Sequence, residues 1–175
     1  MATQNPIEQE GTYPLPEAQT DRFMMKVKID YPSKEEEKQI LQLMGTLGKK
    51  PSVRQILTIE DILAARTIVN DIYIDEKIID YILNITAATR TPNIYHVDIE
   101  GLLLFGASPR ASIALKLASK AYAFLQGRTF VTPQDVKNIA KNVLRHRLRI
   151  TYEAEAENIT ADDIIDRIFS TIPVP

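Results

Sequence analysis

The chain has 175 residues, of which 45% are hydrophobic, and its formal net charge is −2. This length and composition suit one or two small globular units, and the near-neutral charge argues against a mainly electrostatic grip on nucleic acid or on a membrane surface. The absence of cysteine excludes disulfides and cysteine-based metal sites. No apolar run approaches the ~18 residues of a membrane span, and the first residues lack the layout of a signal peptide. We therefore expect a cytoplasmic protein that binds no nucleic acid and inserts into no membrane.

The first 32 residues differ from those that follow. Residues 16–22 predict a short helix opened by Pro16, and residues 23–29 alternate between two faces as a β-strand does. A lone strand is not stable, so this one either joins a sheet that the chain lacks or packs as an arm on the helical part. We favour the missing sheet and expect the segment to be mobile, docked on helices or paired with another chain.

Helical patterns with clear start signals dominate from Ser33 onward, where Ser33 and Glu36 form a capping box. Helices are predicted over residues 33–47, from 58, from 75, over 108–126, over 132–144 and from 160 to Pro173. Residues 91–107 are predicted to form a loop with a turn near Gly101, and residues 145–152 alternate as an extended segment does. The predicted fold class is therefore mainly α.

The segment from Gly106 to Gly127 carries strong helix start and stop signals. Ser108 is a favoured N-cap, Pro109 suits the first helical position, and Gly127 suits the C-terminal end. Arg110 is unusual, because the helix dipole disfavours a cation in the first turn. A helix N-terminus beside a cation can hold a phosphate, whereas the plain alternative is a surface arginine that is merely tolerated. Composition alone favours the plain alternative.

Catalytic motifs are scarce in this sequence. It contains no Gly-x-Ser-x-Gly, no His-Glu-x-x-His and no Gly-x-x-x-x-Gly-Lys-Ser/Thr phosphate loop. Asn5 could orient a water from a strand tip, or it could form an ordinary turn before Pro6. Arg22 could reach a neighbouring molecule from the edge of its unit, or it could be solvated beside Asp21. Taken singly, each residue favours the ordinary explanation.

The basic run at residues 145–149 is short, and acidic residues follow it directly. Favourable cations at a helix C-terminus explain this run better than a nucleic-acid site does. His96 and His146 are the only histidines of the chain. We expect both to be hydrogen-bonded structural residues rather than ligands.

Three stretches in a fixed order resemble the MoxR family of AAA+ ATPases: residues 2–6 (ATQNP), 15–23 (LPEAQTDRF) and 106–111 (GASPRA). The C-terminal part agrees as well, at residues 131–136 (VTPQDV) and 143–147 (VLRHR), so that the resemblance covers essentially the whole chain. Thr20 departs from the family pattern, which has an aliphatic residue there. The resemblance implies a remnant of an α/β ATPase core in residues 1–32, with one strand and a short helix. A helical-bundle AAA+ lid domain would follow in residues 33–175.

The resemblance also implies a role for each residue singled out above. Asn5 looks like the sensor 1 residue, which positions the water that attacks the γ-phosphate. Arg22 looks like the arginine finger, which acts in trans on ATP bound by the adjacent subunit. Arg110 looks like the sensor 2 arginine, which reaches from the lid to the phosphates, with Ser108 and Pro109 beside it at the cofactor.

The family's Walker A and Walker B segments would precede Met1. We therefore expect ATP and Mg²⁺ to be cofactors of the full-length protein, and this fragment to bind neither ATP tightly nor any metal and to be inactive alone. The resemblance implies a ring oligomer, a hexamer, that acts as a chaperone-like motor on partner proteins, including proteins with von Willebrand factor A domains. The alternative is a non-enzymatic helical interaction module that keeps the lid fold.

Overall fold

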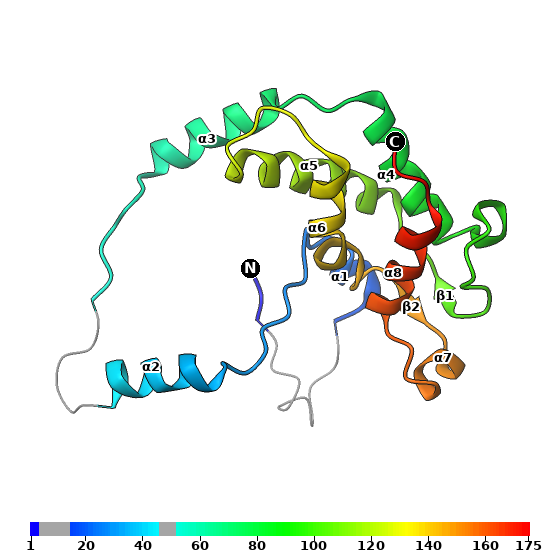
Figure 1. The fold of residues 1–175 in the computed structure, drawn as a ribbon, viewed down its shortest axis with the longest axis horizontal. Coiled ribbons are helices and arrows are strands. Elements are labelled where there is room, and N and C mark those ends of the chain that lie inside the picture. Colours follow the sequence, from blue (N-terminus) through cyan, green and yellow to red (C-terminus); the bar gives the residue numbers. More distant parts are fainter. Residues whose placement is uncertain (4–14, 46–51) are drawn as a thin grey trace.

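The computed structural model describes residues 1–3, 15–45 and 52–175, and within these ranges it is mainly helical, as predicted (Figure 1). The elements in chain order are α1 (Glu17–Thr20), α2 (Lys34–Met44), α3 (Ile59–Asp71), α4 (Glu76–Ala88), the 3₁₀ helix η2 (Pro92–Tyr95), β1 (Leu103–Phe105), α5 (Pro109–Leu125), α6 (Pro133–Leu144), β2 (Arg149–Ile150), α7 (Tyr152–Ala156) and α8 (Ala161–Thr171). None of these helices is both long enough and apolar enough to cross a bilayer.

Four helices, α4, α5, α6 and α8, pack together and form what we call the helical body (Figure 1). Helix α5 lies against α6 and α4, and α8 lies against α6 and α4. Each helix turns an aliphatic face inward, so that Ile85, Leu115, Val143 and Ile168 are fully buried. The hydrophobic core of the described chain therefore lies in the helical body.

The predicted helix start signals are confirmed. A hydroxyl N-cap and an acidic residue three positions later form a reciprocal capping box at the starts of α2, α3, α6 and α8, with Ser33, Thr58, Thr132 and Thr160 as the caps. Asp75 caps α4, and Gly127 follows the end of α5 with a left-handed φ of 69°.

Helices α2 and α3, which we call the outer helices, contain no buried residue. Figure 1 shows α2 standing apart from the helical body, whereas α3 lies along α5. Both outer helices expose large apolar side chains, among them Leu41 on α2 and Leu63 on α3. Their local sequence forms helices, but the described chain offers them little to pack against.

The predicted strand at residues 23–29 is wrong, because this segment forms no strand and belongs to no described sheet. No described strand lies beside it to complete a ladder, so side chains and a helix end bind its backbone instead. The N–H of Lys26 donates to the carbonyl of Asn142 at the end of α6, at 2.7 Å. Of the anticipated outcomes, docking on the helices is the one observed, for what we call the docked segment (residues 21–28).

Two further predictions need correction in the second half of the chain. The expected loop at residues 91–107 contains η2 and β1, although its turn is confirmed by Gly101, which has a φ of 74°. The expected extended segment at 145–152 is a strand only at β2, and α7 already begins at Tyr152 because Thr151 caps it. Strands β1 and β2 pair antiparallel, with Leu103 opposite Ile150.

Candidate functional site

The N-terminus of α5 is fixed in place by its cap and by the end of α4. The Oγ of Ser108 accepts the N–H of Arg110 at 3.2 Å, and Pro109 is the first helical residue, as the sequence predicts. The preceding N–H, that of Ala107, donates to the buried Oγ1 of Thr89 at 2.9 Å. A Cβ on Gly106 would overlap the Thr89 carbonyl, so only glycine allows this close approach.

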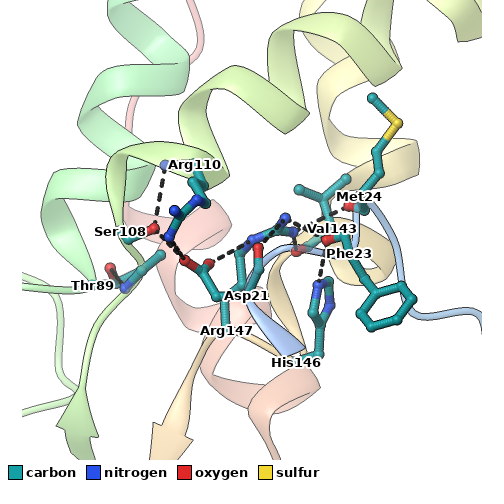
Figure 2. Close-up of polar contacts among 10 residues, drawn as sticks. Asp21, Phe23, Met24, Thr89, Ser108, Arg110, Val143, His146 and Arg147 are labelled. Atoms are coloured by element: carbon teal, nitrogen blue, oxygen red, sulfur yellow. Dashed lines mark hydrogen bonds and ion pairs between the residues drawn. The ribbon is translucent and has the colours of Figure 1, made fainter. Parts of the chain in front are cut away.

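A single carboxylate, that of Asp21, occupies the space in front of this helix start (Figure 2). Its Oδ2 accepts the Ser108 hydroxyl at 2.9 Å and Nη1 of Arg110 at 3.2 Å. Its Oδ1 accepts Nε of Arg147 at 3.1 Å. The structure therefore brings Arg110 and the segment that carries Arg22 together through Asp21.

The two arginines that meet Asp21 differ in exposure. The side chain of Arg147 is 2% exposed and that of Arg110 is 56% exposed. Arg147 also donates through Nη2 to the carbonyls of Asp21 and Phe23, at 3.2 and 2.6 Å, and through Nη1 to the carbonyls of Met24 and Val143. Arg147 is thus an internal anchor, whereas Arg110 remains accessible.

The electrostatics of this cluster leave a positive excess. Burial acts to raise the pKa of the Asp21 carboxyl, but hydrogen bonds from Ser108 and Arg110 and the charge of Arg147 outweigh it, so this pKa lies below its usual value. Burial lowers the pKa of Arg147, against the effect of Asp21, from a starting value so high that the guanidinium stays protonated. Two guanidinium groups and one carboxylate make a net charge of about +1 at neutral pH.

The remaining predicted site residues lie differently. The side chain of Arg22 is exposed and has no hydrogen-bond or ion-pair partner among the residues that the structure describes. Arg22 lies two positions after the end of α1, between Asp21 and Phe23, whose carbonyls both bind Arg147. Asn5 lies outside the described residues.

Two more side chains of the 145–147 run hold the docked segment. Nε2 of His146 lies 3.0 Å from the carbonyl of Phe23, so the expectation that His146 is a hydrogen-bonded structural residue is confirmed. Arg145 donates to Asp162 at the start of α8 and to the carbonyl of Lys26. The side chain of His96, in contrast, has no hydrogen bond within the described ranges.

Sequence reasoning missed Asp21 and Arg147 as members of the site. The sequence presents Asp21 only as the neighbour of Arg22, and Arg147 only as a cation near the end of α6. The second interpretation is correct in part, because Arg147 does donate to the carbonyl of Val143 in the last turn of α6. The contact between Asp21 and Arg147 spans 126 positions of the chain, and no local pattern indicates it.

This arrangement suits an anion with several oxygen acceptors. The accessible guanidinium of Arg110 is the group that can donate to such an anion, because the Ser108 hydroxyl already donates to Asp21 and accepts the N–H of Arg110. A magnesium site is a different matter, since the described residues contain no group of three or more His, Cys, Asp or Glu side chains placed to hold a metal.

Two family models match the sequence. The AAA lid domain matches residues 99–168, which include α5, α6 and most of α8, and the ATPase family associated with various cellular activities (AAA) matches residues 1–25. The chain therefore contains a helical AAA+ lid preceded by a remnant of the ATPase core, as predicted.

Relatives agree with these matches. The chain is 43% identical to "Chaperone MoxR1" of Mycobacterium tuberculosis over 100% of its length and 46% of that protein, and 40% identical to protein YeaC of Bacillus subtilis over 100% and 52%. A crystal structure of a protein from Cytophaga hutchinsonii, described provisionally as an ATPase, superimposes with a TM-score of 0.92 at 42% identity and covers 98% of this chain and 52% of that one. These matches support a fragment of a MoxR-family AAA+ ATPase, and the chain spans about half the length of the curated relatives it matches.

Proposed function

We propose that this chain is the lid-bearing part of a chaperone-like AAA+ ATPase, in which Arg110 senses the nucleotide phosphates. The accessibility of Arg110 carries the proposal. This residue lies in the first turn of a well-capped helix, its side chain is 56% exposed, and its ion pair with Asp21 lies at the surface. In this proposal, residues 1–32 belong to the ATPase core and residues 33–175 form the lid. The role of ATP is to supply the phosphoanhydride bond whose hydrolysis drives the motor.

The chemistry of Arg110 follows from its position. A guanidinium is planar, always charged and able to form two parallel hydrogen bonds with phosphate oxygens. Ser108 caps this helix start and donates its hydroxyl to Asp21 beside Arg110, and Pro109 fixes where the helix begins. Binding a phosphate there brings the lid toward the nucleotide and stabilises charge that develops on the phosphoryl oxygens.

Substitution of Arg110 in the full-length protein tests this role. We expect Arg110→Ala to lower the turnover number for ATP by about 10²-fold, because it removes one positioned donor. Lys116→Ala is the matched control, since Lys116 is an exposed cation on the same helix and lies outside the cluster. Unchanged turnover in Arg110→Ala, measured by phosphate release, would contradict the proposal.

Arg22 is proposed to act as the arginine finger for the neighbouring subunit. Its side chain is exposed and has no partner among the described residues, which supports this role. We expect Arg22→Ala to lower turnover by about 10³-fold or more with little change in nucleotide affinity, because a finger acts on the transition state. Asn5 is proposed to orient the attacking water, and Asn5→Ala tests it by the same comparison of turnover with affinity.

The fragment itself is proposed to be inactive. The sequence lacks a Gly-x-x-x-x-Gly-Lys-Ser/Thr loop, and the described residues supply no ligand set for Mg²⁺. Isothermal titration of the 175-residue chain with Mg·ATP is expected to show no micromolar binding, and micromolar affinity would contradict this part of the proposal.

The assembly and location of the protein are also proposals. We propose a cytoplasmic hexameric ring that works on partner proteins with von Willebrand factor A domains. The lid assignment and the name of the Mycobacterium tuberculosis relative, a chaperone, support this role. Analytical ultracentrifugation of the full-length protein with and without nucleotide tests the ring, and a monomer under both conditions would contradict it.

A further inference from the structure

Arg147 uses every donor of its side chain within the cluster. A guanidinium has five N–H groups, and those of Arg147 meet the Asp21 carboxylate and the carbonyls of Asp21, Phe23, Met24 and Val143. The side chain is 2% exposed, so no water competes for these donors. Five bonds from one buried group fix the backbone of residues 21–24 against the end of α6.

The pattern of these bonds isolates one residue. Carbonyls on both sides of Arg22 are bound, yet its own side chain is exposed and has no partner in the described part of the chain. A residue that acts on another molecule needs a fixed backbone and an exposed side chain. The direction of that side chain is then set before the other molecule binds.

The same carboxylate also reaches Arg110. Asp21 binds Arg147 through Oδ1 and binds Arg110 and Ser108 through Oδ2. The contact with Arg110 is an exposed ion pair, which contributes little, whereas the contact with Arg147 is buried and bonded throughout. Arg110 can therefore leave Asp21 for another anion while Asp21 stays in place.

We propose that Arg147 is a positioning residue for Arg22, and that Asp21 links this anchor to Arg110. This inference rests on the proposed roles of Arg22 and Arg110. Arg147 touches neither nucleotide nor substrate; it acts by holding the backbone from which Arg22 extends. Binding of a phosphate by Arg110 would remove one hydrogen bond that Asp21 accepts and leave its bond to Arg147 in place.

Arginine-to-lysine substitutions at two nearby positions provide a matched pair. Lysine keeps the charge of Arg147 but has three donors on one nitrogen, so it cannot bind the same spread of carbonyls. Arg145→Lys is the control, because Arg145 contacts Asp162 and Lys26 but not residues 21–24. Asp21→Asn is the second variant, which keeps the shape of the side chain and removes the charge.

The first measurement is amide hydrogen exchange in the 175-residue chain. We expect Arg147→Lys to speed exchange over residues 21–25 by about tenfold relative to the amides of α8, and Arg145→Lys to change it less than about twofold. A purely structural role would instead speed exchange throughout the helical body. Equal protection of residues 21–25 in Arg147→Lys and in the unchanged chain would overturn the inference.

The second measurement uses mixed rings of the full-length protein. One subunit type carries Arg22→Ala and an intact nucleotide site; the other cannot bind nucleotide and serves only to donate Arg22. Donor subunits with no other substitution or with Arg145→Lys should restore ATP turnover. Donor subunits with Arg147→Lys should give a turnover lower by about tenfold or more, and donors with Asp21→Asn should give an intermediate turnover.

Each result of the mixing decides one point. If Arg22→Ala donors restore turnover, the finger role itself is wrong. If Arg22→Ala donors fail and both Arg147→Lys and Asp21→Asn donors succeed, the finger role holds and the positioning inference is overturned. If Arg147→Lys does not fold, Asp21→Asn alone decides, and full donation by it contradicts the inference.

Discussion

The capping box that opens α2 and the one that opens α6 have the same bonds. Ser33 pairs with Glu36 in the first, and Thr132 pairs with Asp135 in the second. Yet α6 buries aliphatic side chains such as Val136 and Ile139, and α2 buries none. Local signals therefore decide where a helix begins, whereas a neighbouring surface decides whether it adds to a core. The outer helices keep large apolar side chains exposed, although α3 lies along α5.

Removing a buried side chain from the helical body should have the largest effect. Ile168 on α8 is fully buried, so Ile168→Ala leaves a cavity and should lower the free energy of unfolding by about 2–5 kcal/mol. Ile62 on α3 is 49% exposed, and Ile62→Ala should change the free energy of unfolding by less than about 0.5 kcal/mol. Urea unfolding of the 175-residue chain measures both, and similar losses would show that α3 belongs to the same core.

Removing a helix cap should have a smaller effect on stability, and the effect should again be larger in the helical body than in the outer helices. Thr132→Ala should lower the free energy of unfolding by about 1 kcal/mol, because α6 unfolds with the core. Ser33→Ala should leave global unfolding unchanged and only reduce the helicity of α2, since α2 buries nothing. Thermal unfolding and far-ultraviolet circular dichroism separate the two responses, and a lower melting temperature in Ser33→Ala would remove the contrast.

The smallest expected effect is a pH dependence of the docked segment. Burial, with the charges of Arg147 and Lys26, lowers the pKa of His146 against the bond to the Phe23 carbonyl and the charge of Asp21. The unfolded chain therefore takes up this proton more readily than the folded one. The stabilisation is present above the unfolded pKa of about 6.5 and is lost as the pH falls below it.

Partial solvent access keeps this effect to a fraction of the ~1.4 kcal/mol that a full unit of pKa shift would give. His146→Gln should flatten the change in melting temperature between about pH 7.5 and pH 5.5, whereas His96→Gln, the control, should leave its slope unchanged. Equal slopes in His146→Gln and in the unchanged chain would show that His146 does not carry the effect.

The parts of the structure that the sequence could predict are those that depend on neighbouring residues. The caps at Thr58 and Thr160 and the start of α5 at Ser108 each rest on contacts within three positions of the chain. Arg110 was correctly placed at a helix start for the same reason. Its partner Asp21 was not foreseen, because 89 positions separate the two and neither residue type specifies the other.

The errors have a physical cause as well. Residues 23–29 have the alternation of a strand, but a strand also requires a neighbour, and here the carbonyls of Phe23 and Met24 bind Arg147 instead. The alternation of side chains at residues 145–152 predicts an extended segment, but Thr151 caps a helix there and α7 begins. A period of two describes only how the side chains alternate. Whether a segment forms a strand depends on the hydrogen-bond partners of its backbone.

The anchor formed by Arg147 has a consequence for sequence variation. It binds Phe23 and Met24 through their main-chain carbonyls, which every amino acid possesses. Substitution at these two positions should therefore be tolerated among related chains, within the limits of packing. An aspartate at position 21 and an arginine at position 147 should change rarely and together, because the bond between their side chains depends on both.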